Sequence, residues 1–188
     1  MPVDGKVRVS LRDFVVDGRF DGLEIGQSKD WVAQHFVEPD GVETENLTQG
    51  CEIWRFGHME LHFFEGTLFM VFCDSFITWD KKLRDRWDAG SRIELDYWIF
   101  KKAARLNLGT VSKRLIRERI THQVIYNQDI GNSVIRIPAS GVELVFDPVK
   151  DDDGNPNHSP FGAMSLSWSS RLNRDDQALT SCPTAIPD

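Results

Sequence analysis

The sequence lacks the features that would place the chain in a membrane or in a disulfide-rich class. No window approaches the roughly 18 consecutive apolar residues that a membrane-spanning helix needs, and the amino terminus has no basic stretch followed by an apolar one. Its three cysteines, Cys51, Cys73 and Cys182, form no CxxC pair and leave one residue over in any disulfide scheme. We therefore expect a soluble cytoplasmic protein with reduced thiols and no membrane partner.

Basic residues are also in short supply. Acidic residues outnumber basic ones by 29 to 22, giving a net charge of −7, which argues against a general nucleic-acid binder and favours a basic partner. The exception is the stretch 101–120, which carries a net charge of +6. This basic stretch is either a local anion site or the solvated face of a helix whose Leu115, Ile116 and Ile120 point inward.

Catalytic signatures are absent from the sequence as well. It contains no GxSxG, GxxxxGK(S/T), GxGxxG or HExxH motif, so we expect no cofactor and no enzyme of those classes. His58, Glu60 and His62 alternate and would share one face of a strand, where two imidazoles and a carboxylate suit a catalytic metal. The alternative is a polar strand face that is available to a partner.

An internal similarity organises what is present. A shift of 83 residues places DFVVDGRFDGLEIG (13–26) on DYWIFKKAARLNLG (96–109), and the same shift places MELHF (59–63) on VELVF (142–146). Trp54-Arg55-Phe56 matches Ile135-Arg136-Ile137 at a shift of 81. One offset that recurs along the chain indicates a tandem duplication.

Each unit shows helical periodicity followed by strand alternation. We predict helices over 8–18 and 27–36, with Ser28 as a cap, and over 92–105 and 110–120, with Thr110 as a cap. Three strands follow in each unit: 51–56, 58–64 and 68–73 in the first, and 133–137, 142–146 and 163–169 in the second. The expected fold is α+β, with a helix-helix-three-strand unit repeated and an antiparallel sheet of about six strands carrying helices on one face.

The predicted organisation has four parts. Residues 1–75 form the first repeat, 76–91 a connecting segment, 92–170 the second repeat and 171–188 a polar tail. Within the strands, Met59, Leu61 and Phe63 match Val142, Leu144 and Phe146, so these six side chains should meet the helices, and Met164, Leu166 and Trp168 should continue the set.

The other sheet face is the predicted binding surface. Exposed aromatic residues beside charges are typical of such surfaces, and the alternative is that the connecting segment covers this face. The face would carry Ile53, Arg55, His58, Glu60, His62, Phe64, Phe69, Val71 and Cys73. The predicted partner-binding residues are Arg55, His58, Glu60, His62, Phe64, Phe69 and Val71, together with Trp79 of the connecting segment.

Two resemblances bear on function. The segment LEIGQS (23–28) followed by IWRFGHMELHF (53–63) resembles a pattern of small bacterial proteins, L-x-x-G-x-S and then iW-x-(F/Y)-G-x-x-E-h-x-F, some of which are immunity proteins carried beside toxin genes. The tandem helix-helix-three-strand plan resembles the architecture of beta-lactamase inhibitor protein, which grips an enzyme with its concave sheet face.

These resemblances imply an immunity or inhibitor protein that occludes a cognate bacterial toxin, without direct nucleic-acid contact. The acidic net charge suits a basic toxin such as a nucleic-acid-targeting effector. The acidic segment 38–45 (EPDGVETE) is an alternative contact that would mimic phosphate. Two other hypotheses stay open: a small metal-dependent enzyme that uses His58, Glu60 and His62, and a homodimer that pairs its open sheet faces, so the oligomeric state is either monomer or homodimer.

Overall fold

The computed structural model of the chain describes residues 6–45, 47–73, 89–101, 106–127, 129, 131–148 and 156–167. Within these residues the fold is mixed α+β, as the sequence predicts. Most of the expected connecting segment 76–91, including Trp79, lies outside the described residues, as does the tail 171–188.

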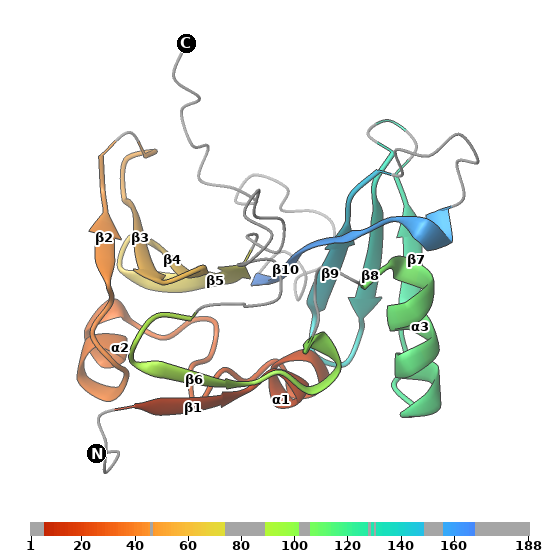
Figure 1. The fold of residues 1–188 in the computed structure, drawn as a ribbon. Helices are drawn as coiled ribbons and strands as arrows, with labels where there is room; N and C mark the ends of the chain where they lie inside the picture. The colour runs from red at the N-terminus through yellow and green to blue at the C-terminus, as the bar shows by residue number, and fades with distance from the viewer. Residues whose placement is uncertain are drawn as a thin grey trace.

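The main sheet has eight antiparallel strands in the order β2-β3-β4-β5-β10-β9-β8-β7 (Figure 1). Each half of the chain contributes four strands, and the pair β5–β10 joins the halves at the centre. A separate two-stranded sheet pairs β1 with β6 in parallel. The strands are β1 (Val7–Ser10), β2 (Gly41–Glu43), β3 (Cys51–Phe56), β4 (Met59–Phe64), β5 (Thr67–Cys73), β6 (Ile93–Asp96), β7 (Gln123–Tyr126), β8 (Ser133–Ile137), β9 (Val142–Phe146) and β10 (Phe161–Ser167).

The prediction of about six strands is therefore wrong, because both edge strands were missed. β2 has three residues and lies inside the acidic segment 38–45, where no apolar alternation marks a strand. All four residues of β7 are exposed, so this strand has no buried side to give an alternating pattern. The central strands of both halves were predicted because each has one buried face.

The helices are short and are fixed by their caps. They are α1 (Leu11–Asp17), α2 (Lys29–His35) and α3 (Leu108–Arg117), with 3-10 turns η1 (Trp98–Phe100) and η3 (Pro156–His158). Ser10 and Ser28 accept hydrogen bonds from Asp13 and Trp31, as N-caps do. None of the described helices is long and apolar enough to cross a membrane.

Two helix predictions in the second half need correction. The stretch predicted as a helix over 92–105 begins instead with β6 and η1, because Ile93 and Leu95 are buried in the parallel pair with β1. α3 begins at Leu108 and not at Thr110, since Asn107 is the cap and its side-chain oxygen accepts the amide of Thr110. Asn is at least as good a cap as Thr, and the helix therefore begins two residues earlier than predicted.

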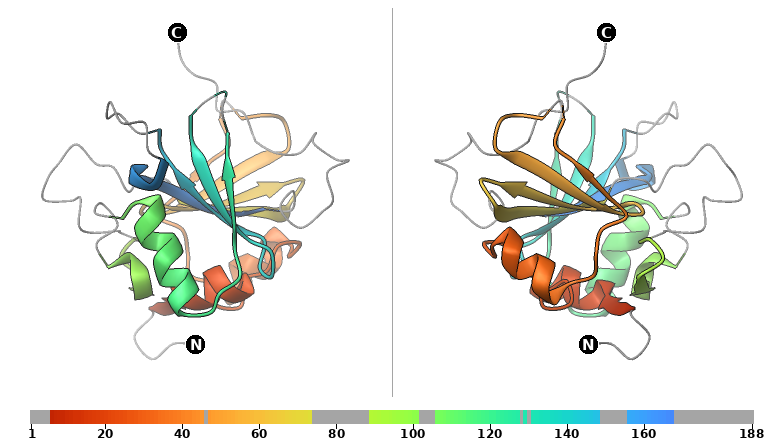
Figure 2. Two further views of the ribbon diagram at one scale, coloured as in Figure 1. Left: turned by 90° about the vertical axis from the view of Figure 1, so that its right-hand side faces the viewer. Right: turned by 90° about the vertical axis from the view of Figure 1, so that its left-hand side faces the viewer.

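The helices and the β1–β6 pair lie on one side of the main sheet, as both views of Figure 2 show. The core fills the space between these layers and contains all six side chains predicted from the internal similarity: Met59, Leu61, Phe63, Val142, Leu144 and Phe146. Phe14 of α1 and Phe100 of η1 are also buried there. The predicted inward face of the strands is thus confirmed in both halves where side chains are described.

The two halves repeat one order of elements. Each begins with a strand of the parallel pair, continues with two helical segments and ends with four strands of the main sheet; the second half has in addition the 3-10 turn η3 before its last strand. The hairpins share their register too, because Arg55 lies opposite Glu60 in β3–β4 and Arg136 lies opposite Glu143 in β8–β9. Both pairs are ion pairs. These are the positions that the shifts of 81 and 83 residues bring together.

The cysteines differ from the expectation of three reduced thiols. Cys51, at the start of β3, is part of a disulfide, whereas Cys73 at the end of β5 is a buried thiol. Cys182 lies outside the described residues. The expectation is therefore wrong for Cys51, and the cytoplasmic location that was inferred from reduced thiols stays a prediction.

Candidate functional site

Four polar side chains form a connected cluster on the sheet face that points away from the helices. The β3–β4 register places Arg55 opposite Glu60, and Ile53 opposite His62. The guanidinium of Arg55 lies 2.5 Å from a carboxylate oxygen of Glu43 and 3.4 Å from Oε1 of Glu60. Oε2 of Glu60 accepts a hydrogen bond of 2.8 Å from Nε2 of His62. Three adjacent strands thus combine to hold one arginine at the surface.

His62 anchors the buried end of this cluster. The residue is 6% exposed, and the rings of Phe69 and Phe72 meet its ring edge-on at centroid distances of 6.1 Å. Its Nδ1 is buried without a hydrogen-bond partner. A buried nitrogen without a partner lowers the stability of the fold. Because Nδ1 has no partner, the hydrogen bond from Nε2 to Glu60 is the polar contact that holds the imidazole in place. Glu60 is fixed in turn, and it orients Arg55.

Glu60 is acidified by this arrangement. The hydrogen bond from His62 lowers the pKa of the Glu60 carboxyl below its ordinary 4.5, and the charges of His62 and Arg55 act in the same direction against the opposing effect of burial. A carboxyl whose pKa is lowered on folding stabilises the fold above its unfolded pKa. This stabilisation is lost as the pH falls through the folded value.

We expect Glu60→Gln to lower the free energy of unfolding at pH 7 by about 1–2 kcal/mol, the size of a lost charge-assisted hydrogen bond. The deficit should shrink as the pH falls from the ordinary carboxyl pKa of 4.5 through the lower pKa of the folded protein, because the Glu60 carboxyl of the wild type then becomes protonated as well. Urea unfolding of both proteins from pH 7 to pH 3 measures the difference. An equal deficit at both ends of this range contradicts the assigned role of the Glu60 charge.

The structure places only some residues of the predicted binding face as expected. Arg55, Glu60, His62, Phe64 and Phe69 lie on the face away from the helices, but His62 and Phe69 are buried and Phe64 is half-buried. Their burial means that they support this face from beneath and do not form an open surface. Arg55, whose side chain is 50% exposed, is the most exposed member of the cluster.

Val71 was assigned to the wrong face. It is 2% exposed and packs in the core cluster with Leu61 and Cys73, so Cys73 was misplaced too. The cause is a bulge: His62 pairs with Met70 while the next residue, Phe63, pairs with Leu68, leaving Phe69 without a partner opposite. A bulge reverses the alternation of side chains along the strand. Residues beyond Phe69 therefore point to the face opposite from the one that simple alternation predicts.

The hypothesis of a metal site at His58, Glu60 and His62 has no support from the positions of these residues. His58 lies in the turn between β3 and β4, not on the strand with the other two. His62 and Glu60 bond to each other. In the part of the chain that the structure describes, no group of three or more His, Cys, Asp or Glu side chains is placed to hold a metal ion.

The β2 edge of the sheet carries an acidic surface. Val42, at the centre of β2, is 55% exposed. Four carboxylates surround it in sequence with no intervening base, at Glu38, Asp40, Glu43 and Glu45. Arg92 and Arg55 pair with Glu38 and Glu43, and Asp40 accepts the amide of Gly57. These contacts fix the acidic segment 38–45 on the fold, and we call it the acidic edge.

The opposite edge, at β7, was missed by sequence reasoning. Val124, Ile125 and Tyr126 are consecutive exposed residues, and Ile116 of α3 is 64% exposed, so the prediction that Ile116 points inward is wrong. Leu115 does point inward and is fully buried. One signal in the sequence could have indicated this edge. The run QVIY (123–126) follows the basic stretch and carries no charge, and such a run fits neither a buried strand nor a solvated loop.

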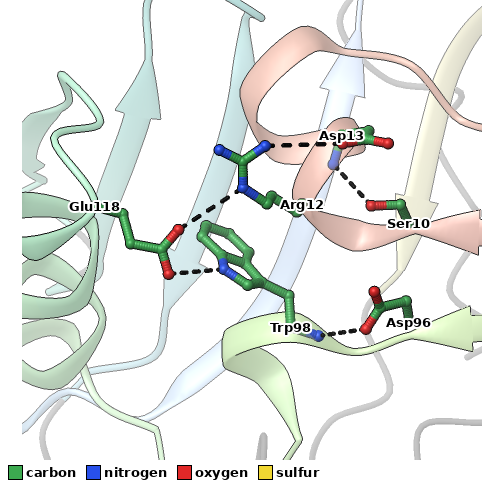
Figure 3. Close-up of polar contacts among 6 residues, drawn as sticks. All are labelled: Ser10, Arg12, Asp13, Asp96, Trp98 and Glu118. Atoms are coloured by element: carbon green, nitrogen blue, oxygen red, sulfur yellow. Dashed lines mark hydrogen bonds and ion pairs between the residues drawn. The ribbon is translucent and has the colours of Figure 1, made fainter.

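A second polar cluster holds the two halves together (Figure 3). Glu118, at the end of α3, accepts the indole N–H of Trp98 at 2.8 Å and lies 3.8 Å from Nε of Arg12 in α1. Asp96 accepts the backbone N–H of Trp98, whose φ is 45°. A left-handed conformation is strained in a tryptophan, and these two hydrogen bonds offset that strain. The cluster is a structural joint between α1, η1 and α3.

Comparisons with protein-family models, with curated proteins and with solved structures find no match. The choice among functions therefore depends on the chemistry of the surfaces that this chain presents. Two of them stand out: the acidic edge at β2, which continues into the Arg55 cluster, and the apolar edge at β7.

Proposed function

We propose that this protein is an inhibitor of the immunity type, which binds a basic bacterial toxin and neutralises it by occlusion. The acidic edge is the observation that carries the proposal. It places an exposed apolar side chain, Val42, on ordered backbone within a segment that carries four carboxylates. A fixed acidic surface with an apolar centre matches a basic protein surface, because complementary fields speed encounter and apolar contact slows release.

The contacts follow from which side chains reach solvent. Val42 supplies the apolar centre, and the indole of Trp31, which is exposed and stacked on His35 at 4.2 Å, supplies an aromatic anchor in the same half. Arg55 contacts the toxin directly. Glu43 and Glu60 hold its guanidinium, and His62 holds Glu60, so the buried members of the predicted face act as positioning residues.

We also propose that the chain arose by tandem duplication of a unit with one strand, two helical segments and four strands. Three observations support this: the repeated order of elements, the shared register of the two Arg–Glu hairpins, and the caps of α2 and α3. The caps Ser28 and Asn107 each form a bridge to the start of a central strand, at Thr67 and Pro160. In a duplicated fold β2 and β7 are equivalent edges, and they have diverged to acidic and apolar chemistry.

The equivalence of the two edges supplies a matched pair of variants. Val42→Lys and Val124→Lys each replace a half-exposed valine in an edge strand, since the wild-type residues are 55% and 51% exposed. We expect Val42→Lys to weaken binding of the basic partner at least about 30-fold, because a like charge at an interface costs several kcal/mol. Val124→Lys should leave this affinity unchanged.

The measurement is titration calorimetry with the purified product of the gene immediately upstream, at low and high salt. Retained affinity in Val42→Lys, or an equal loss in both variants, contradicts the assignment of the acidic edge. Binding that does not weaken with salt contradicts the electrostatic part of the proposal.

A further inference from the structure

We infer that the β7 edge is a second docking site, which takes an extended acidic segment of another protein as a ninth strand of the main sheet. This inference is independent of the proposed function, since it concerns the opposite edge of the sheet. It combines three properties of β7: its terminal place in the sheet, its uncharged exposed sequence and the bases of the neighbouring helix.

The outer side of β7 presents unused backbone groups. Asn127 donates its amide to Asn132, and the β7–β8 register then assigns Gln123 and Ile125 to the positions that bond to β8. The intervening residues, Val124 and Tyr126, direct their N–H and C=O groups away from β8. No strand lies beyond β7 among the described residues. This is the pattern of donors and acceptors that a peptide needs in order to add to a sheet.

Protein sheets protect exposed edges with charge, bulges or very short strands. β2 follows this rule, with three residues, Glu43 in the strand and further acids around it. β7 does not follow it, because Val124, Ile125 and Tyr126 are all exposed and the strand contains no charged residue. An edge left unprotected in one half and protected in the other is best explained by use in binding.

The positive charge beside β7 favours an acidic partner. α3 lies next to β7 in Figures 1 and 2, and Ser112 of α3 bonds to His122 just before the strand at 2.9 Å. Lys113, Arg117 and Arg119 are exposed on this helix or just after it, and none forms an ion pair with a described residue. Val124 lies opposite the buried Ile135, so it shares the helix side of the sheet. Side chains of an added strand on that side would face Val124, Tyr126 and these bases.

A second copy of this chain fits the edge less well than an acidic segment. Antiparallel pairing of β7 with itself would bring two α3 helices, each with these bases, to the same side of the joined sheet. For an acidic strand, attraction to the nearby bases of α3 outweighs repulsion by the net negative charge of the chain, because charges more than about 10 Å away are screened at ordinary ionic strength.

The probes are three nine-residue peptides with blocked ends: one alternating valine and glutamate, one alternating valine and lysine, and the glutamate peptide with a central proline. We expect the glutamate peptide to bind at least tenfold more tightly than the other two, as measured by fluorescence anisotropy. Amide hydrogen exchange should then slow at Val124 and Tyr126 of the full-length protein. The amide of Ile125, which already bonds to β8, should change little.

Val124→Pro is the blocking variant, because it removes an outward N–H and leaves the β8 ladder intact. We expect it to lower the affinity for the glutamate peptide at least tenfold, while Val42→Asp at the other edge leaves it unchanged. If Val124→Pro fails to fold, Lys113→Glu/Arg117→Glu serves instead and should abolish the preference for glutamate over lysine. Equal binding of the glutamate and lysine peptides overturns the inference, and so does an absence of protection at Val124 and Tyr126. A β7-dependent dimer in sedimentation overturns it in favour of self-association.

Discussion

Val71→Asp should prevent the protein from folding, whereas Met70→Asp should cost only about 1–2 kcal/mol. Val71 is 2% exposed in the core cluster. Met70 precedes it on the opposite face, paired with His62 and half-buried. An unpaired carboxylate in the core costs several kcal/mol and removes the apolar contacts of valine as well. Because the whole stability of a domain is only about 5–15 kcal/mol, this single change is enough to unfold it.

These two neighbouring variants test the bulge at Phe69 directly. Simple alternation of the strand from Phe69 reverses the expected order of the two effects, since it places Val71 on the outer face and Met70 in the core. Circular dichroism and urea unfolding of both proteins give the answer. A folded Val71→Asp protein together with an unfolded Met70→Asp protein contradicts the register of β4 and β5 described above.

The sequence was sufficient to predict those strands that have one buried face. The inward positions Met59, Leu61 and Phe63, and their counterparts in β9, were recovered because apolar residues alternate there. The cap Ser28 was recovered because its side chain acts locally. The Arg55–Glu60 pair was placed correctly on one strand face, since residues opposite each other in a hairpin share a side.

The errors have a common physical origin in longer-range structure. The bulge at Phe69 depends on how β5 fits between β4 and β10, so alternation along β5 alone misplaced Val71. The beginning of the stretch predicted as a helix over 92–105 is instead the strand β6, because it pairs in parallel with β1. β2 and β7 escaped prediction because edge strands need no buried face, and they prove to carry the two surfaces on which the functional proposals depend.

The candidate site could also be predicted only in part, because it too depends on longer-range packing. The residues singled out in the sequence, Arg55, Glu60 and His62, do come together as one cluster. Their burial could not be predicted, because it depends on the packing of Phe69 and Phe72 around His62. The acidic segment 38–45 had been considered as an alternative contact. Its place at an ordered sheet edge makes it the centre of the proposal.

The central claim is that this protein neutralises a toxin through its acidic edge, and the largest expected effect is on growth. In a heterologous bacterium, the product of the upstream gene should stop growth when it is expressed alone. Co-expression of the wild-type protein, or of Val124→Lys, should restore colony counts to those of cells with an empty vector. Val42→Lys should fail to restore them, because its added charge repels the basic partner.

The measurement that decides the claim is therefore the colony count of these strains on inducing medium, with immunoblots confirming equal amounts of each variant. We expect full rescue by the wild type and Val124→Lys, and no rescue by Val42→Lys. A harmless upstream product, or rescue by Val42→Lys equal to that of the wild type, would contradict it.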